Sequence, residues 1–321
     1  MKKETITIFI LLIFLVSCDS RTGDENSESI DVATLRGPSA ISMIHMIDSL
    51  QSIQDKKINF QVKNEPLQIR PLLFQEKVEF AVVPTNMAAI LYNKGVNYQL
   101  AAVPVWGTLY LFDNSKEVDS WSDLKGKKIH LMAKGMTPDV MFRFLLDKNG
   151  IDPLKDVELD YSFPTHIELA NAVASGKAEL GVISEPMVSM VISKNNRVKP
   201  VLSLNEEWKK QTSMEIPQTA LLVNKTYASE NQQAVNQFLK KYAESIRWIN
   251  NHQKNGANLI VKNNILENEQ VAYQSIPRCN MQFRYAYDIR EMVSDYLKIF
   301  HRMNPDIIGG KLPDEDFYYK K

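Results

Sequence analysis

Polar and small side chains recur where a predicted strand gives way to a predicted helix. The first such point carries Arg36, Gly37 and Ser39, and another carries Thr85 and Asn86. Ligands of open α/β sheets bind beyond the carboxyl ends of the strands, where helix N-termini offer free N–H groups. A helix start there favours a negative or acceptor-rich ligand group by about 0.3–1 kcal/mol. These residues are therefore candidates for binding a small molecule.

Each of these residue types suits such a contact, and each has a structural alternative. Gly37 permits close backbone approach, and the Ser39 hydroxyl can bind a ligand or only start a helix. The Arg36 guanidinium could hold a carboxylate or sulfonate in bidentate fashion, or be a surface or inter-lobe charge. Thr85 and Asn86 could point into a cleft, cap a helix, or do both.

A second group of candidates follows the same pattern further along the chain. Thr137 opens a predicted helix, Phe163 follows a predicted strand, and Thr108 lies where a strand leaves the first unit. Trp106 could stack on a planar ligand or pack at a hinge. Glu185 could accept a hydrogen bond from a ligand amine, or pair with a lysine across a closed cleft.

The remaining reactive residues do not form a catalytic or metal-binding pattern. The chain has no P-loop, no Gly-x-Ser-x-Gly, no Cys-x-x-Cys and no His-Glu-x-x-His motif. Met43, His45 and Met46 are interspersed with isoleucines, which is typical of a core helix. Asp113 and Glu117 are predicted to be solvated charges, and Cys279 a buried structural thiol. We therefore predict no metal, no cofactor and no enzymatic activity.

Strand and helix signals alternate in two successive units and predict an α/β fold of two lobes. Each lobe is expected to hold a mostly parallel sheet flanked by helices. Two extended segments, 108–112 and 219–223, flank the second unit and predict two crossing strands that act as a hinge. The expected boundaries are 30–112 and 224–321 for lobe I, and 113–223 for lobe II.

The N-terminal residues predict export and not a membrane span. Lys2 and Lys3 precede an apolar run of about 11 residues, which is too short to cross a bilayer, so 1–17 is predicted to be a signal peptide. Residues 18–29 lack large apolar side chains and are expected to form a flexible tether. The chain carries 38 basic and 38 acidic residues, and this balance gives no indication of nucleic-acid binding.

The sequence Leu15-Val16-Ser17-Cys18 resembles the lipobox of bacterial lipoproteins. This resemblance implies that the leader is removed before Cys18 and that the Cys18 sulfur carries lipid, including acyl chains such as palmitate. The mature protein would then be anchored to a membrane in the cell envelope and face the periplasm or the cell exterior.

Four local patterns resemble the substrate-binding proteins of ABC importers, in particular the nitrate, sulfonate and taurine type that includes binders of thiamine-precursor pyrimidines. The patterns lie at 35–40, 78–86, 121–129 and 174–182, and the resemblance covers about residues 30 to 300. It implies a periplasmic-binding-protein fold of type II that closes on its ligand by hinge bending. It also implies a monomer that delivers a small molecule to permease and ATPase subunits.

The resemblance leaves the ligand and two other functions open. Arg36 and the helix N-termini favour a sulfonate, nitrate or carboxylate anion, whereas Trp106 and Phe163 favour a pyrimidine-like heterocycle. A solute-sensing lipoprotein is one alternative function. The other is an enzyme on the same scaffold, similar to menaquinone-pathway enzymes or pyrimidine synthases, although the Cys-rich iron motif of those synthases is absent.

Overall fold

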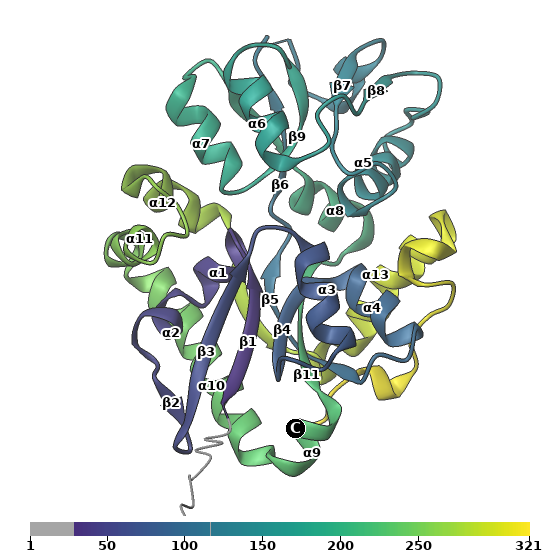
Figure 1. The fold of residues 1–321 in the computed structure, drawn as a ribbon. Helices are drawn as coiled ribbons and strands as arrows, with labels where there is room; N and C mark the ends of the chain where they lie inside the picture. Colours follow the sequence, from purple (N-terminus) through teal and green to yellow (C-terminus); the bar gives the residue numbers. More distant parts are fainter. Residues whose placement is uncertain (1–28, 116) are drawn as a thin grey trace, which may run out of the picture.

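The computed structural model describes residues 29–115 and 117–321. The predicted signal peptide, Cys18 and nearly all of the predicted tether lie outside these residues. Two β-sheets, one above the other in Figure 1, form the centres of two lobes with flanking helices. This confirms the predicted two-lobed α/β fold. The sheets are mixed, however, and not mostly parallel as predicted, because the strands next to the crossings pair antiparallel with their neighbours. Among the described residues, no helix has both the length and the apolar character that crossing a bilayer requires.

The sheet of the first lobe has seven strands in the order β12-β5-β11-β4-β1-β3-β2. The strands β1, β3 and β4 pair in parallel, whereas β11 pairs antiparallel with both of its neighbours. The bounds are β1 (Ile30–Leu35), β2 (Ser52–Ile53), β3 (Lys56–Lys63), β4 (Phe80–Pro84), β5 (Tyr98–Trp106), β11 (Pro217–Asn224) and β12 (Met281–Tyr285). A strand that returns from the other lobe thus completes the middle of this sheet.

The sheet of the second lobe has five strands in the order β10-β6-β9-β7-β8. Here β7 is parallel to β8 and β9, and β6 is antiparallel to β9 and β10. The bounds are β6 (Leu109–Asp113), β7 (Lys128–His130), β8 (Glu158–Asp160), β9 (Leu180–Ser184) and β10 (Lys199–Ser203). The strand β6 enters from the first lobe and is antiparallel to both of its neighbours, as β11 is in the first sheet.

Helices cover both sheets because each presents an apolar stripe to a strand face. On the longest helix, α10, the residues Val235, Phe238, Leu239 and Tyr242 recur at helical spacing and are fully buried. The first lobe holds α1 (Pro38–Ser42), α2 (Ile44–Ser49), α3 (Pro66–Phe74), α4 (Thr85–Asn93), α9 (Lys225–Glu230), α10 (Gln232–Asn251), α11 (Gln253–Lys262), α12 (Glu269–Ser275) and α13 (Arg290–Met303). The second lobe holds α5 (Thr137–Lys148), α6 (His166–Ala174), α7 (Met187–Lys194) and α8 (Leu204–Thr212).

Short 3₁₀ turns complete the described elements. They are η1 (Trp121–Leu124), η2 (Ile276–Arg278), η3 (Tyr287–Ile289), η4 (Pro305–Ile308) and η5 (Glu315–Phe317). The turn η2 follows α12 directly and, as described below, lies next to α7 of the second lobe.

The hydrophobic core continues from one lobe into the other. One buried cluster contains Trp106 and Leu109 at the crossing together with Trp208 of α8 and Tyr296 of α13. The rings of Trp208 and Tyr296 lie 5.7 Å apart, so a helix of the second lobe packs directly on a helix of the first. The two lobes are therefore in contact beside the crossing segments.

The predicted lobe boundaries need correction. Strand β6 (Leu109–Asp113) pairs within the second sheet, and β11 (Pro217–Asn224) pairs within the first. The second lobe consequently begins near 109 and ends near 213, and not at 113 and 223. The predicted extended segments are real strands, but each belongs wholly to the sheet that it enters, and the crossings between lobes are the short stretches around 107 and 214.

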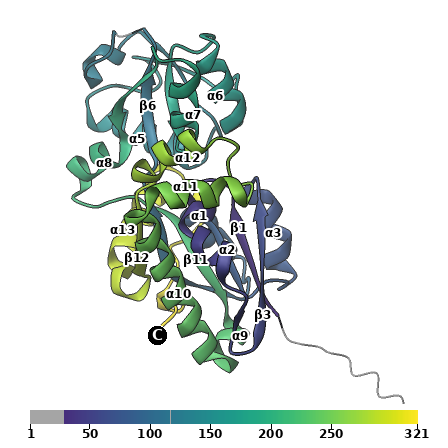
Figure 2. The same cartoon turned by 90° about the vertical axis from the view of Figure 1, so that its left-hand side faces the viewer.

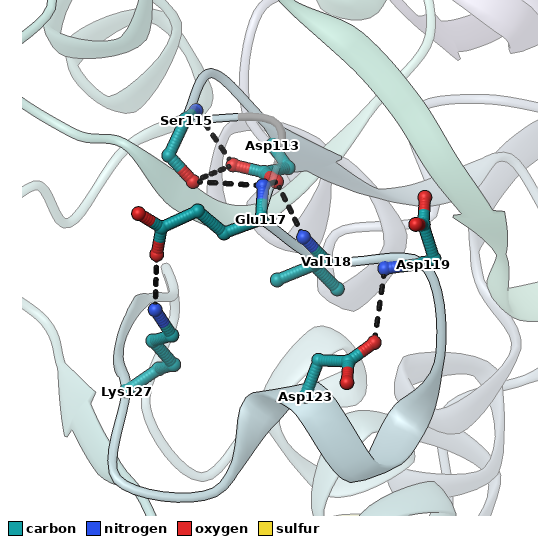
Figure 3. A network of polar contacts seen from close by, with 7 residues as sticks. All are labelled: Asp113, Ser115, Glu117, Val118, Asp119, Asp123 and Lys127. Carbon is teal, nitrogen blue, oxygen red and sulfur yellow. Dashed lines mark hydrogen bonds and ion pairs between the residues drawn. The ribbon is translucent and has the colours of Figure 1, made fainter.

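Asp113 is not a solvated charge, contrary to the prediction. The residue is only 1% exposed. Its carboxylate accepts hydrogen bonds from the backbone N–H groups of Ser115, Glu117 and Val118 at 2.7–2.9 Å (Figure 3). Glu117, which pairs with Lys127, is exposed as predicted. Asp113 thus organises the turn after β6, at the end of that strand remote from the first lobe.

Candidate ligand-binding site

The carboxyl ends of the parallel strands in the two sheets face each other. In the first lobe, Pro84 at the end of β4 pairs with Thr219 near the start of β11. In the second lobe, Ser184 at the end of β9 pairs with Leu109 at the start of β6. Because β6 and β11 adjoin the two crossings, both strand ends lie beside the hinge, and the helix starts that follow them converge on one region between the lobes.

Gly37 marks a close approach between the lobes. Its φ of 97° lies in the region that favours glycine, and a Cβ atom on Gly37 would lie 3.3 Å from Cδ of Pro186 in the second lobe. The predicted need for a small residue at Gly37 therefore has a structural basis. Next to it, Ser39 is buried in the first turn of α1, and its carbonyl oxygen accepts a hydrogen bond from the Ser42 hydroxyl at 2.6 Å.

Asn86 and Thr137 connect the N-termini of two helices, one from each lobe. Thr137 Oγ1, at the first residue of α5, donates to Asn86 Oδ1 on α4 at 3.0 Å. Asn86 Nδ2 donates to the carbonyl of Ile307 at 3.3 Å. Thr85 is buried beside Asn86 and donates from Oγ1 to the carbonyl of Pro217 at 2.5 Å. The predicted residues Asn86 and Thr137 are thus brought together.

A buried acid holds the loop that precedes Thr137. Asp139 accepts hydrogen bonds from the Gly135 backbone N–H at 2.7 Å, from Arg143 Nε at 2.7 Å and from the Tyr161 hydroxyl at 2.6 Å. This network connects the start of α5 to the segment after β8. Thr137 is therefore held at the lobe interface by the second lobe's own contacts.

Thr108 and Gln218 tie the two crossings together. The backbone N–H of Thr108 donates to Gln218 Oε1 at 2.6 Å, and Gln218 Nε2 donates back to Thr108 Oγ1 at 2.7 Å. One residue earlier, the Gly107 N–H donates to the Ile216 carbonyl at 3.0 Å. The two connections between the lobes consequently run side by side as a double hinge.

Glu185 forms an ion pair across the lobe interface. The residue is 1% exposed, and its carboxylate accepts from Arg278 Nε and from the Ser189 hydroxyl at 2.9 and 3.0 Å. Arg278 belongs to η2 of the first lobe, whereas Glu185 and Ser189 belong to the second. Burial raises the pKa of Glu185, and the Arg278 guanidinium opposes that shift. Of the two predicted alternatives, the structure shows pairing across the cleft, but the partner is an arginine and not a lysine.

Aromatic and imidazole groups gather near the strand ends of the second lobe. Phe163, just after β8, is half-buried with its ring centroid 5.5 Å from that of His130. The ring nitrogen Nδ1 of His166 lies 3.0 Å from the Ser184 hydroxyl. Desolvation lowers the pKa of His166 to about 4 and also lowers that of His130. Both imidazoles are therefore neutral at pH 7 and can donate or accept hydrogen bonds.

Two predicted site residues are occupied by contacts within the first lobe. Trp106 is 0% exposed, donates from Nε1 to the Gln282 carbonyl at 2.7 Å, and has the Arg284 guanidinium 4.2 Å from its ring centroid. Its ring is committed to packing in the first lobe and is not presented to a ligand, so the stacking role is corrected to the alternative of hinge packing.

Arg36 is likewise committed elsewhere. Its guanidinium donates to Asn64 Oδ1 at 2.7 Å and to the carbonyls of Asn264 and Ile265. These contacts tie the loop after β1 to the end of α11. Of the predicted alternatives for Arg36, the structure shows the one in which it is a surface charge, and Arg36 is not part of the site considered below.

Three residues at the interface were missed by sequence reasoning. Gln218 lies near the start of β11, at the second crossing, as Thr108 lies at the first. A polar residue at that crossing could have indicated a contact with Thr108. Ser189 lies four residues after Glu185 on α7, which is the spacing of side chains on one helix face. Arg278 has no comparable signal, because nothing in the sequence links it to Glu185.

Cys279 is fully buried, as predicted, and burial raises the pKa of its thiol well above the usual value. Such a thiol is protonated and unreactive at neutral pH.

Comparison with known proteins agrees with this geometry. Residues 44–265 match the family model described as the phosphonate periplasmic substrate-binding protein of ABC transporters. The chain belongs to this family. A candidate binding protein of Bacillus subtilis (strain 168), YtlA, is 29% identical over 183 residues, which are 57% of this chain and 53% of YtlA. The chain thus matches about half the length of that relative.

Solved structures with the same fold include transport proteins from several organisms. An ABC transporter structure from Parabacteroides distasonis has a TM-score of 0.81 and 27% identity, covering 91% of this chain and 99% of that one. The aliphatic sulphonate binding protein SsuA of Escherichia coli has a TM-score of 0.71 and 14% identity, covering 92% and 94%. SsuA of Xanthomonas axonopodis pv. citri, bound to MOPS, has 0.66 and 12%, covering 90% and 96%. These similarities confirm the predicted fold.

Proposed function

We propose that this protein captures a small molecule between its lobes and delivers it to the permease and ATPase of an ABC importer. The main support is the convergence of helix N-termini from both lobes at the Asn86–Thr137 contact. A ligand that touches both lobes favours the closed state, so binding and closure are coupled. Its role is binding without turnover.

The proposed site consists of Gly37, Ser39, Thr85, Asn86, Thr108, Thr137 and Phe163, joined by Gln218 at the hinge. Glu185 is left out because its carboxylate is paired with Arg278 and would repel an anion. We propose an anionic, acceptor-rich ligand of the phosphonate or sulfonate kind. The starts of α4 and α5, the hydroxyl groups and the neutral imidazoles supply hydrogen-bond donors for such a group. The alternative, a pyrimidine-like heterocycle, has less support because Trp106 is committed to packing and only Phe163 is left to contact a ring.

The ligand proposal is tested by a thermal-shift screen of the purified protein with methylphosphonate, methanesulfonate, nitrate, acetate and a hydroxymethylpyrimidine, followed by native mass spectrometry. We expect a 1:1 adduct with one of the anions, an increase in melting temperature and no chemical change in the ligand. Consumption of the ligand would contradict the proposal and support an enzyme, and an adduct with the pyrimidine alone would overturn the anionic ligand class.

The site is tested by the double variant S39W/T137W, which puts bulky side chains at the start of α1 and α5. We expect the adduct to be lost. Because Ser39 is buried, circular dichroism has to show that the double variant is folded, and T137W alone, at a half-buried position, should also weaken the adduct. The matched control is Leu154→Trp, at a position that is 80% exposed in the second lobe and outside the proposed site. Wild-type affinity in the double variant would contradict the proposed site.

We also propose that Cys18 anchors the protein to a membrane through lipid. Support comes from the lipobox-like residues 15–18 and from family membership. Mass spectrometry of the N-terminal peptide from the membrane fraction should show a diacylated Cys18, and C18A should release the protein from that fraction. An unmodified peptide in wild-type protein would contradict the anchor.

A further inference from the structure

The ion pair between Arg278 and Glu185 is the most deeply buried charged contact described between the two lobes. Figure 2 shows α12 of the first lobe lying beneath α7 of the second, and Arg278 ends the turn η2 that continues from α12. Arg278 Nε donates to Glu185 Oε1, and Nη2 donates to the Ser189 hydroxyl at 2.6 Å. Ser189 donates in turn to both carboxylate oxygens of Glu185.

Arg278, Glu185 and Ser189 form one hydrogen-bond network in which each side chain contacts the other two. The Ser189 backbone N–H also donates to Glu185 Oε2 at 3.2 Å, and the Glu185 N–H donates to the Thr108 carbonyl at 3.0 Å. These contacts hold Glu185 in position independently of Arg278. The Glu185 side chain is 0% exposed, whereas that of Arg278 is 31% exposed. A buried carboxylate of this kind is strongly destabilised if its cationic partner is removed.

The network depends on the closed arrangement of the lobes. Because Arg278 and Glu185 come from different lobes, any opening about the double hinge that moves η2 away from α7 breaks both guanidinium contacts at once. The protein's own side chains make these contacts. Two other inter-lobe contacts, Gly37 with Pro186 and Thr137 with Asn86, accompany the pair in the same closed state.

We propose that Arg278, Glu185 and Ser189 form a clasp that holds the lobes closed without a ligand. The protein itself then sets the balance between open and closed states, and a ligand adds its contacts to an equilibrium that is already biased toward closure. Only the consequence for affinity depends on the proposed function. If the clasp is weakened, a smaller fraction of the protein is closed. The affinity for every ligand then falls by the same factor.

The clasp is tested by measuring lobe separation with no ligand present. Nitroxide labels are placed on L67C in the first lobe and L154C in the second, at positions that are 68% and 80% exposed, in the full chain carrying Cys18→Ser. Cys279 is fully buried and stays unlabelled. Double electron–electron resonance then gives the distribution of distances between the labels.

We expect a predominant short distance in the otherwise wild-type chain, and a shift to longer distances in E185Q and in R278Q, with the closed-to-open ratio reduced about tenfold. The charge-exchanged double variant E185R/R278E should recover part of the short-distance population. The matched control is D48N, which removes an acid that pairs with Lys262 within the first lobe and should leave the distribution unchanged.

Two results would overturn the clasp: a long-distance distribution in the unliganded wild-type chain, or an unchanged short distance in both E185Q and R278Q with the fold intact by circular dichroism. If E185Q alone fails to fold, R278Q, which alters the more exposed partner, decides the outcome. Since no ligand is used, this experiment can fail or succeed independently of the ligand screen that tests the proposed function.

Discussion

Individual residues between the lobes have roles that depend on what their neighbours already bind. Trp106 is an example, because an indole beside a hinge could stack on a ligand or pack in the core. Its Nε1–H donates to the Gln282 carbonyl, and its ring is covered by Arg284, so both its polar and its aromatic capacity are used within the first lobe. Arg36 is likewise occupied, by Asn64 and the end of α11.

If Trp106 serves packing, W106F should lower the free energy of unfolding and leave ligand affinity unchanged. The loss of one buried hydrogen bond and a weaker cation–π contact with the smaller phenyl ring predict a decrease of about 1–3 kcal/mol. Urea denaturation measures the stability, and titration with the ligand found in the screen measures the affinity. A large loss of affinity at unchanged stability would return Trp106 to the binding site.

His166 predicts a pH dependence of stability. Desolvation lowers its pKa to about 4 in the folded protein, against about 6.5 in an unfolded chain. The unfolded chain therefore binds a proton first as the pH falls, so stability decreases between about pH 6.5 and pH 4 and then levels off with respect to this group. Replacing His166 with glutamine should reduce this slope. Urea denaturation at pH 7, 6, 5 and 4 checks it, and an identical slope in H166Q would contradict the assignment.

At the scale of elements, Gly181 allows β9 to pair closely with β7. A Cβ atom at Gly181 would lie only 2.3 Å from the backbone oxygen of His130, so the two strands would have to separate. We expect G181A to cost about 2 kcal/mol or more, in the range of strained core substitutions.

The matched control for G181A is Gly256→Ala on α11, where the new Cβ would meet the side chain of Ile249 at 2.9 Å. Ile249 is fully buried and its side chain has to shift, but alanine favours a helix by about 1 kcal/mol over glycine and offsets part of that cost, so G256A should cost less than G181A. Thermal unfolding of both variants measures the difference. Equal stability of G181A and wild type would mean that the strands part without cost.

Most of the elements could be predicted because strand and helix signals alternate clearly in this chain. The exceptions are informative. Strand β12 (Met281–Tyr285) was not predicted, because five residues at the edge of a sheet resemble the start of the helix that follows. The apolar residues from 38 to 53 would suit one continuous helix, but the structure has two, α1 and α2, with a break at Met43, where ψ is 0°, and the chain then enters the two-residue strand β2. In both places the structure is determined by packing against the rest of the molecule and not by the helix preference of the local sequence.

The candidate site could be predicted only as far as chain position determines it. Helix starts that follow parallel strands must meet at one edge of a sheet, and the hydrogen bond between Asn86 and Thr137 shows that two of them meet between the lobes. That these residues bind a ligand stays a prediction. Whether a charged side chain is already paired depends on residues distant in sequence. Arg36 and Glu185 lie in comparable strand-end positions, yet their partners are 228 and 93 residues away.

For the whole molecule, the double hinge predicts that lobe orientation can change without loss of the fold. Gln218 makes two reciprocal hydrogen bonds with Thr108, and both connect one crossing to the other. We expect Q218A to increase the radius of gyration in small-angle X-ray scattering, because the two crossings are less constrained.

The control for Q218A is Gln99→Ala, which removes a hydrogen bond to the Asp316 carbonyl within the first lobe only. It should leave the scattering unchanged, and both variants should keep melting temperatures within a few degrees of wild type. A scattering curve for Q218A that matches wild type would show that Thr108 and Gln218 do not limit lobe movement.

The position of β11 also determines the order in which the molecule can be built. This strand fills the gap between β4 and β5, although its residues are synthesised more than one hundred positions after β5 ends. The first sheet is therefore incomplete until the chain has passed through the whole second lobe, whose own strands are contiguous in sequence. Contacts of such long range slow folding. The second lobe can therefore fold from contiguous sequence, whereas the first sheet has to wait for β11 and then for β12.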